Sequence, residues 1–249
     1  MHLFRPLLPL ALSTLALSGP AFGQTAPTGA PQPAVALLRQ QYDASFDNHP
    51  QLYSGLEYAD YTRRYHKRTG DPFFFSPEPQ PGSVDYNNHH FGGVRLNYDE
   101  VLDQVLLTQP NNPVLIRLIE EQLRGFALGP ARFVRLVADS ASGGVIRTGY
   151  YQVLADGRAQ VLARRTKRLQ EHLNQPYVDV EFVASTKFFV QKGGQYYPVR
   201  SKSNVVRLLA DRSKDVQQYL KAHPLKFNKA QFEPSVVELV AYYNGLPPQ

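Results

Sequence analysis

Cysteine and tryptophan are absent from the 249-residue sequence, and methionine occurs once. The absence of cysteine excludes a disulfide framework, a thiolate metal site, a cysteine nucleophile and a lipid anchor on an N-terminal cysteine. No apolar run after the N-terminus reaches the roughly 20 residues of a membrane helix. With 43% hydrophobic and 19% charged residues, the chain is still too apolar to be disordered, and it is long enough to bury a stable core.

The N-terminus has the three-part layout of a secretory signal peptide. A basic start, Met1 to Arg5, precedes a leucine-rich core, Leu7 to Leu17, and then small and helix-breaking residues, Ser18 to Gly23. The apolar core is about half the length that a membrane anchor needs. Cleavage after Gly23 predicts a mature chain of 226 residues with a net charge of +5, in the periplasm or secreted. Residues 24–33 then form a flexible leader, and residues 34–249 a single domain.

Most of the mature chain alternates short apolar runs with turn residues, which is typical of antiparallel strands. Ala34 to Tyr42 is an exception with helical spacing, and Leu52 to Tyr65 predicts a loop with a short strand. Asp156-Gly157 predicts a type I′ hairpin turn, and Lys192-Gly193-Gly194 a second hairpin. The predicted strands cover residues 84–86, 91–98, 105–107, 114–116, 123–128, 132–138, 145–154, 159–166, 187–190 and 195–199.

The period changes to that of helices over residues 203–245. Ser203 is the expected cap of a first helix, Asp211 or Ser213 the cap of a second that ends at His223-Pro224, and Pro234 fits the first turn of a third. We therefore predict an α+β fold: an antiparallel β meander, as a sheet or partly closed barrel, followed by a C-terminal helical segment. A separate helical subdomain is the alternative.

His89-His90 beside Asp85 is the nearest approach to a metal cluster, because imidazole and carboxylate together suit zinc or iron. Neighbouring residues of a strand point to opposite faces, so the pair chelates one ion only if it lies in a loop. The Asn87-Asn88 turn allows this, although two solvated histidines are the simpler interpretation. No cofactor motif is present.

Other patterns for catalysis are weak. Asp99, Glu100 and Asp103 place three carboxylates together, but without a calcium-type loop we expect a solvated turn between two strands. No serine lies in a G-x-S-x-G or S-x-x-K pattern, and no glycine loop has phosphate-binding spacing. No catalytic residue is therefore assigned.

The densest charge feature is the basic run Arg164, Arg165, Lys167 and Arg168, interrupted by Thr166. It resembles an exposed or edge strand that charge keeps from pairing. Its functional interpretation is a surface that binds an anion or a partner. Because export makes nucleic acid an improbable partner, an anionic envelope component or another envelope protein is the expected one.

Charge is divided unevenly along the mature chain. Residues 24–130 carry 8 basic and 12 acidic residues, a net charge of −4, whereas residues 131–249 carry 18 and 9, a net charge of +9. We expect the two halves to neutralise each other in part across the sheet, with the excess positive charge near the basic run and the C-terminal helices.

Three segments carry a resemblance to a known family: Gly149 to Leu154 with Thr166 to Glu171, Phe188 to Val190 with Gln195 to Val199, and Ser201 to Ser203. In these motifs the chain, over roughly Leu52 to Leu246, resembles a family of secreted, functionally uncharacterised proteins common in Bacteroidota. The resemblance implies export across the inner membrane and a soluble or envelope-associated protein. It implies no catalytic residue.

The sequence thus favours a non-enzymatic binding or structural module that meets its partner through a strand edge or a basic face. A hydrolase acting on an envelope polymer is the alternative, with Asp85, His89 and His90 as the first residues to test.

Overall fold

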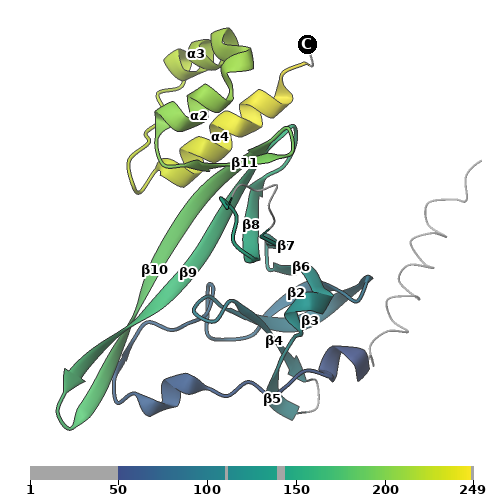
Figure 1. The fold of residues 1–249 in the computed structure, drawn as a ribbon, viewed down its shortest axis with the longest axis vertical. Helices are drawn as coiled ribbons and strands as arrows, with labels where there is room; N and C mark the ends of the chain where they lie inside the picture. The colour runs from purple at the N-terminus through teal and green to yellow at the C-terminus, as the bar shows by residue number, and fades with distance from the viewer. Residues whose placement is uncertain (1–49, 110–111, 139–143, 248–249) are drawn as a thin grey trace, which may run out of the picture. The chain divides into compact units, whose positions relative to one another are not determined.

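The computed structural model describes residues 50–109, 112–138 and 144–247, all of which belong to one compact unit, residues 43–249. The predicted signal peptide, leader and first helix lie outside the described residues. The described chain is α+β, as predicted: a mostly antiparallel, open sheet of 11 strands comes first, and three helices follow (Figure 1).

The elements are short apart from one hairpin. Residues Leu52 to Tyr65 form two 3-10 turns, η1 (Pro50–Tyr53) and η2 (Tyr61–Arg64), with only an isolated bridge from Glu57 to Ile116, so the short strand predicted there is wrong. The strands are β1 (Arg68–Thr69), β2 (Gln80–Tyr86), β3 (His89–Asp99), β4 (Gln104–Gln109), β5 (Asn112–Arg117), β6 (Leu123–Leu128), β7 (Ala131–Leu136), β8 (Gly149–Ala155), β9 (Ala159–Asn174), β10 (Tyr177–Lys192) and β11 (Gln195–Val199). The helices are α2 (Lys202–Leu208), α3 (Ser213–Ala222) and α4 (Phe232–Gly245), with the 3-10 turns η3 (Glu120–Gln122) and η5 (Ala210–Arg212).

The sheet consists of two meanders rather than one. The strand order is β1-β10-β9-β8-β7-β6-β2-β3-β4-β5, and β11 pairs with β10 beside this path. Strand β2 pairs with both β3 and β6, and so joins the meander β2 to β5 to the meander β6 to β11. Only β1 is parallel to its neighbour, β10.

The β9–β10 hairpin is the longest feature of the sheet. Its two 16-residue strands pair without a register shift from Ala159 opposite Lys192 to Asn174 opposite Tyr177. The sequence prediction ended the first strand at Thr166 and began the second at Lys187, which is wrong. The missed residues are rich in charged and polar side chains, and apolar and polar residues alternate clearly only over residues 178–182.

One hairpin turn differs from the expected type. Asp156-Gly157 joins β8 to β9 as predicted, but only Gly157 has a positive φ, so the turn is not type I′. Positive φ at both central residues occurs instead at Asn87 and Asn88, at 50° and 65°, between β2 and β3, and at Gly193 and Gly194, at 59° and 76°, in the predicted β10–β11 hairpin. Asparagine tolerates this left-handed region, which matches the twist of a two-residue hairpin.

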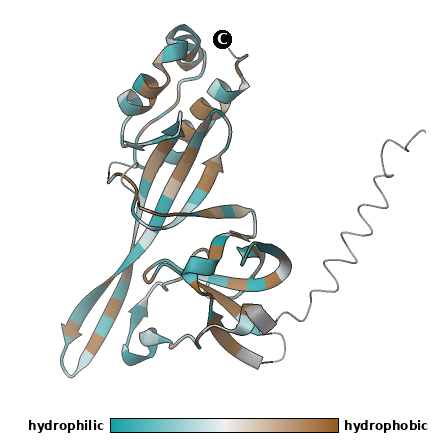
Figure 2. Cartoon of the chain, turned by 45° about the vertical axis from the view of Figure 1, so that its right-hand side comes forward, coloured by the Kyte–Doolittle hydropathy of each residue, from teal (hydrophilic) through white to brown (hydrophobic). Residues whose placement is uncertain are grey.

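Two large hydrophobic cores lie along the sheet. The first fills the space around β2 to β7, with buried aromatic residues such as Tyr98, Phe126 and Phe133. The second lies between the helices and one face of β9 and β10, where Val161 and Val190 meet Val236 and Val240. Figure 2 shows the hydrophobic part of the hairpin next to the helices, giving way to a mixture with hydrophilic residues farther along.

The helix ends follow the predicted signals in part. Pro234 lies in the first turn of α4, and α3 ends at His223, as expected. Ser201 caps α2 in place of Ser203, by accepting from the Asn204 N–H. Asp211 does not cap α3; it accepts hydrogen bonds from Lys192 and from the Tyr243 hydroxyl. Burial raises the Asp211 pKa, but these two hydrogen bonds outweigh it and hold the pKa below its usual value.

Asn244 joins the end of α4 to the β8–β9 turn. Its Oδ1 accepts from the Ala159 N–H at 2.9 Å, and its Nδ2 donates to the carbonyls of Ala159 at 2.8 Å and Asp156 at 3.2 Å. The Asn244 side chain thus forms the backbone hydrogen bonds that a neighbouring strand would otherwise form with the start of β9. Arg158 completes the junction by donating to the carbonyl of Tyr243.

We expect Asn244→Ala to lower the free energy of unfolding by about 1–3 kcal/mol, because it leaves the backbone groups of fully buried Ala159 without partners. Urea denaturation measures the change. Asn174→Ala is the matched control. The Asn174 side chain is exposed at the far end of β9 and, among the described residues, bonds to Asp179 across the hairpin, so its loss should cost no more than about 0.5 kcal/mol. Equal losses for the two variants would show that Asn244 does not anchor α4.

Candidate functional site

The histidine pair lies where predicted, beside the turn between β2 and β3. His90 Nδ1 is 2.7 Å from Asp85 Oδ1, while His89 Nδ1 lies 2.8 Å from the Asn87 carbonyl. Asp85 and His90 face each other across the hairpin, and both side chains are more than half exposed. Across the described residues, no group of three or more His, Asp or Glu side chains has the arrangement of a metal site. The hairpin therefore brings together two of the three candidates.

The acidic turn after β3 is buried, so its prediction as a solvated turn is wrong. Asp99 is fully buried and accepts hydrogen bonds from the hydroxyls of Tyr58 at 2.8 Å and Tyr61 at 3.1 Å. It also accepts from the backbone N–H groups of Val101 and Leu102. Burial and the Asp99 carboxylate raise the pKa of both phenols far above its usual value, so both remain donors.

The two neighbouring carboxylates connect this turn to β9. Glu100 lies 3.4 Å from the Lys167 ammonium group, and Asp103 lies 3.5 Å from Arg164. Burial raises the pKa of Glu100, and the charge of Lys167 opposes this rise. Both pairs join an acid of the first half of the chain to a base of the second, which confirms the predicted neutralisation across the sheet.

The basic run lies in the middle of β9, beyond Ala163, where the pairing of β9 with β8 ends, and among the described strands it pairs with β10 alone. Arg165 forms an ion pair of 2.7 Å with Glu233 of α4, alongside the Arg164 and Lys167 pairs described above. Only Arg168 is exposed, and it donates to Gln170. Three of the four cations are thus engaged with carboxylates, and their side chains are 16 to 18% exposed.

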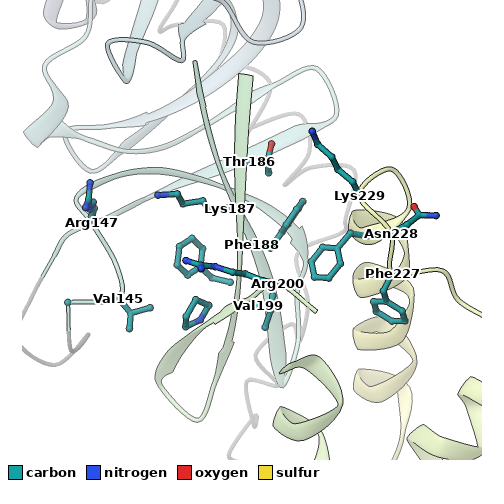
Figure 3. Close-up of a pocket in the computed structure, with 14 residues that line it drawn as sticks. Val145, Arg147, Thr186, Lys187, Phe188, Val199, Arg200, Phe227, Asn228 and Lys229 are labelled. Atoms are coloured by element: carbon teal, nitrogen blue, oxygen red, sulfur yellow. The ribbon is translucent and has the colours of Figure 1, made fainter. Parts of the chain in front are cut away.

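A pocket of about 690 Å³ lies at the outer edge of β10, on the side away from β9 (Figure 3). It begins where β11 ends, and the loop between α3 and α4 lines it from one side. Its lining combines four exposed cations with four phenylalanines. The cations are Arg147, Lys187, Arg200 and Lys229, and the phenylalanines are Phe188, Phe189, Phe227 and Phe232.

The pocket extends over both faces of the sheet edge. Phe188 points towards the helices and packs against Phe232, with ring centroids 5.3 Å apart. Its neighbour Phe189 points the opposite way and packs against Tyr151. Figure 3 shows Lys187 and Arg200 on the side that carries Arg147, and Phe188 on the side of Phe227 and Asn228.

The four cations of the pocket differ from those of the basic run in their partners. Within the described residues, none of them forms an ion pair with a carboxylate, and the described lining contains no acidic side chain. Exposed guanidinium and ammonium groups around an apolar floor suit a ligand with anionic and apolar parts.

Sequence reasoning missed this pocket because its cations are isolated in the chain. They come from the segment before β8, from β10, from the residue after β11 and from the α3–α4 loop. The only signal in the sequence was the net charge of +9 over residues 131–249. It indicated that a positively charged surface exists but not where it lies.

No family model, curated protein or solved structure matches this chain. The resemblance to secreted proteins of Bacteroidota therefore stays a prediction.

We expect Asp99→Asn to lower the free energy of unfolding by about 1–3 kcal/mol. The Asp99 carboxylate is fully buried and accepts from four donors, and the substitution replaces one of its two acceptor oxygens with an NH2 group. Asp85→Asn makes the same change at an exposed position of the same sheet and should stay within about 0.5 kcal/mol of the wild type. Thermal or urea unfolding compares them. An Asp99→Asn protein as stable as the Asp85→Asn protein would contradict a structural role for the acidic turn.

Proposed function

We propose that this protein is an exported, non-enzymatic binding module that holds a ligand with anionic and apolar parts in the pocket at the β10 edge. The observation that carries the proposal is a set of four exposed cations around Phe188, Phe189 and Phe227. Within the described residues, none of these cations forms an ion pair with a carboxylate. An anion placed there gains charge-assisted hydrogen bonds, and its apolar part covers phenylalanine surface that water now contacts.

The chemistry of the pocket favours binding over hydrolysis. Its described lining holds no histidine or carboxylate, so no general base stands beside Thr186, the hydroxyl of the lining. The hydrolase alternative would have to use Asp85 and His90 at the β2–β3 hairpin, where the two groups lie exposed on the surface. The pocket therefore supports the module that the sequence favoured, with its cations at different residues from those predicted.

Export supports an envelope or extracellular ligand. The N-terminal pattern predicts removal of residues 1–23, and none of the helices in the described ranges combines the length and apolar character of a membrane crossing. Anionic groups attached to apolar parts are common among envelope components and among acidic protein segments, and both fit the chemistry of the pocket.

The first test concerns export. We expect the protein expressed with its own N-terminus in a Gram-negative host to be recovered from the periplasm or medium with Gln24 as its first residue, which N-terminal sequencing checks. Replacing both Ala21 and Gly23 by Asp should leave the precursor uncleaved, because the cleavage site requires small residues. A wild-type protein that keeps Met1 and stays in the cytoplasm would contradict the export part of the proposal.

The second test uses two fluorescent probes that differ in charge. We expect the mature protein to bind the anion anilinonaphthalene sulfonate with a Kd of about 10–100 µM, which corresponds to a binding free energy on the order of −0.3 kcal/mol per heavy atom. The neutral counterpart, N-phenylnaphthylamine, should bind more weakly. Changing Arg147, Lys187 and Arg200 together to Gln should weaken sulfonate binding about tenfold and leave binding of the neutral probe unchanged, since each exposed pair contributes about 0.5 kcal/mol.

The matched control removes the same charge elsewhere on the surface. Arg168, Lys214 and Lys221 are exposed and lie outside the pocket lining, and changing all three to Gln should preserve sulfonate binding. Variants of Arg164, Arg165 and Lys167 are unsuitable for this purpose because they break the partly buried ion pairs of β9. If the pocket and control variants lost sulfonate affinity equally, the loss would be due to net charge alone, and the pocket would be refuted as the binding site.

A further inference from the structure

Among the described residues, the outer edge of β10 is paired with a strand at both ends and with none in between. Strand β1 pairs with Val180 and Glu181, and β11 pairs with residues 188–192. Gly70, just after β1, passes Phe182, since a Cβ on this glycine would lie 3.6 Å from the Phe182 Cβ. No described strand pairs with this edge from Val183 to Lys187, and the pocket with the four cations opens at the β11 end of this gap.

Backbone hydrogen-bonding groups point into the gap. On the outer edge, the Val180 N–H donates to the Lys67 carbonyl and the Val178 carbonyl accepts from the His66 N–H. Alternate residues of an antiparallel strand turn their N–H and C=O groups to the same side, and β10 pairs with β9 without a shift. Ala184 and Thr186 therefore direct their backbone groups outward, and both residues are exposed.

The side chains around the gap are divided between the two faces of the sheet. Lys187 shares its face with Arg147 and Arg200, whereas Thr186 shares its face with Phe188, next to Phe227. An extended segment laid against β10 would place alternate side chains on these two faces. Its residues on the first face would meet three cations, and those on the second face would meet phenylalanine rings.

We propose that the gap receives an extended segment of a partner protein in which acidic and apolar residues alternate, added to β10 as a strand between β1 and β11. This inference rests on the proposed function, because the segment would use the same cations and phenylalanines. Strand addition supplies affinity through backbone hydrogen bonds and specificity through alternate side chains. Charge complementarity argues for this occupant over a second copy of the chain, whose edge would bring another Lys187, Arg147 and Arg200 to the same place.

The test measures binding of an acetylated and amidated heptapeptide of sequence Glu-Phe-Glu-Val-Glu-Phe-Glu by calorimetry or fluorescence anisotropy. Two control peptides accompany it: one with N-methyl groups on alternate backbone amides, and one with the four glutamates grouped at one end. We expect the alternating peptide to bind at least tenfold more tightly than either control, since each control removes the backbone bonds or the pattern and keeps the charge.

A proline substitution tests the edge from the side of the protein. Ala184→Pro removes an N–H that points outward and leaves the hydrogen bonds to β9 in place, a change that edge positions tolerate. Ala184→Ser keeps this N–H and is the matched control. We expect Ala184→Pro to weaken peptide binding about tenfold, Ala184→Ser to bind like the wild type, and both to bind anilinonaphthalene sulfonate like the wild type.

The outcomes separate the two proposals. If sulfonate binds in the pocket but the alternating peptide binds no better than its N-methylated form, strand addition is refuted and the proposed function stands. If neither sulfonate nor peptide binds, the proposed function itself fails. Equal peptide binding by the proline and serine variants refutes strand addition, and if the proline variant does not fold, the N-methylated peptide decides. A wild-type dimer that Ala184→Pro converts to a monomer would make a second copy the occupant and overturn the inference.

Discussion

The unbroken ladder between β9 and β10 is the constraint on which the rest of the structure depends. One end of it forms the floor of the helical core, where Val161 and Val190 lie under α4. Farther along, Arg164 and Lys167 reach the carboxylates of the acidic turn, which belongs to the first meander. The second core includes residues of both hairpin strands, whereas the first core includes none, so the hairpin reaches the first meander through these ion pairs.

The partly buried ion pairs on this hairpin explain why the cations of the chain fall into two groups. Arg164, Arg165 and Lys167 pair with carboxylates of the acidic turn and of α4, and breaking such a pair leaves its partner charge uncompensated in a poorly solvated place. The cations at the β10 edge, such as Lys187 and Arg200, are exposed and have no described carboxylate. The first group joins separate segments of the fold, and the second group is the one that the proposed ligand would contact.

The parts of the fold that were predictable from the sequence are those with local signals. Strands β2 to β7 lie between clear turn residues, and Pro234 and His223 mark helix ends whatever their surroundings. The length of the hairpin was not predictable, because many of residues 167–186 are charged or polar and are held by strand pairing and ion pairs. The short apolar stripe of Val180 and Phe182 packs against Tyr65, more than 100 positions earlier in the chain. Likewise, Asp99 has the charge of a surface residue, and it is buried only because Tyr58 and Tyr61, some 40 positions earlier, supply donors. The pocket has the same origin, since Arg147 and Lys229 meet only in the folded chain.

The unbroken register of β9 and β10 also limits how related chains can differ in length. One residue inserted into β10 between Val183 and Lys187 would exchange the two faces of the strand beyond it, placing a lysine under the helices and a phenylalanine on the opposite side. A hairpin lengthened by two residues in each strand would keep every side chain on its face. Related chains should therefore vary the length of this hairpin in even steps, with freedom concentrated at its exposed tip, residues 173–177.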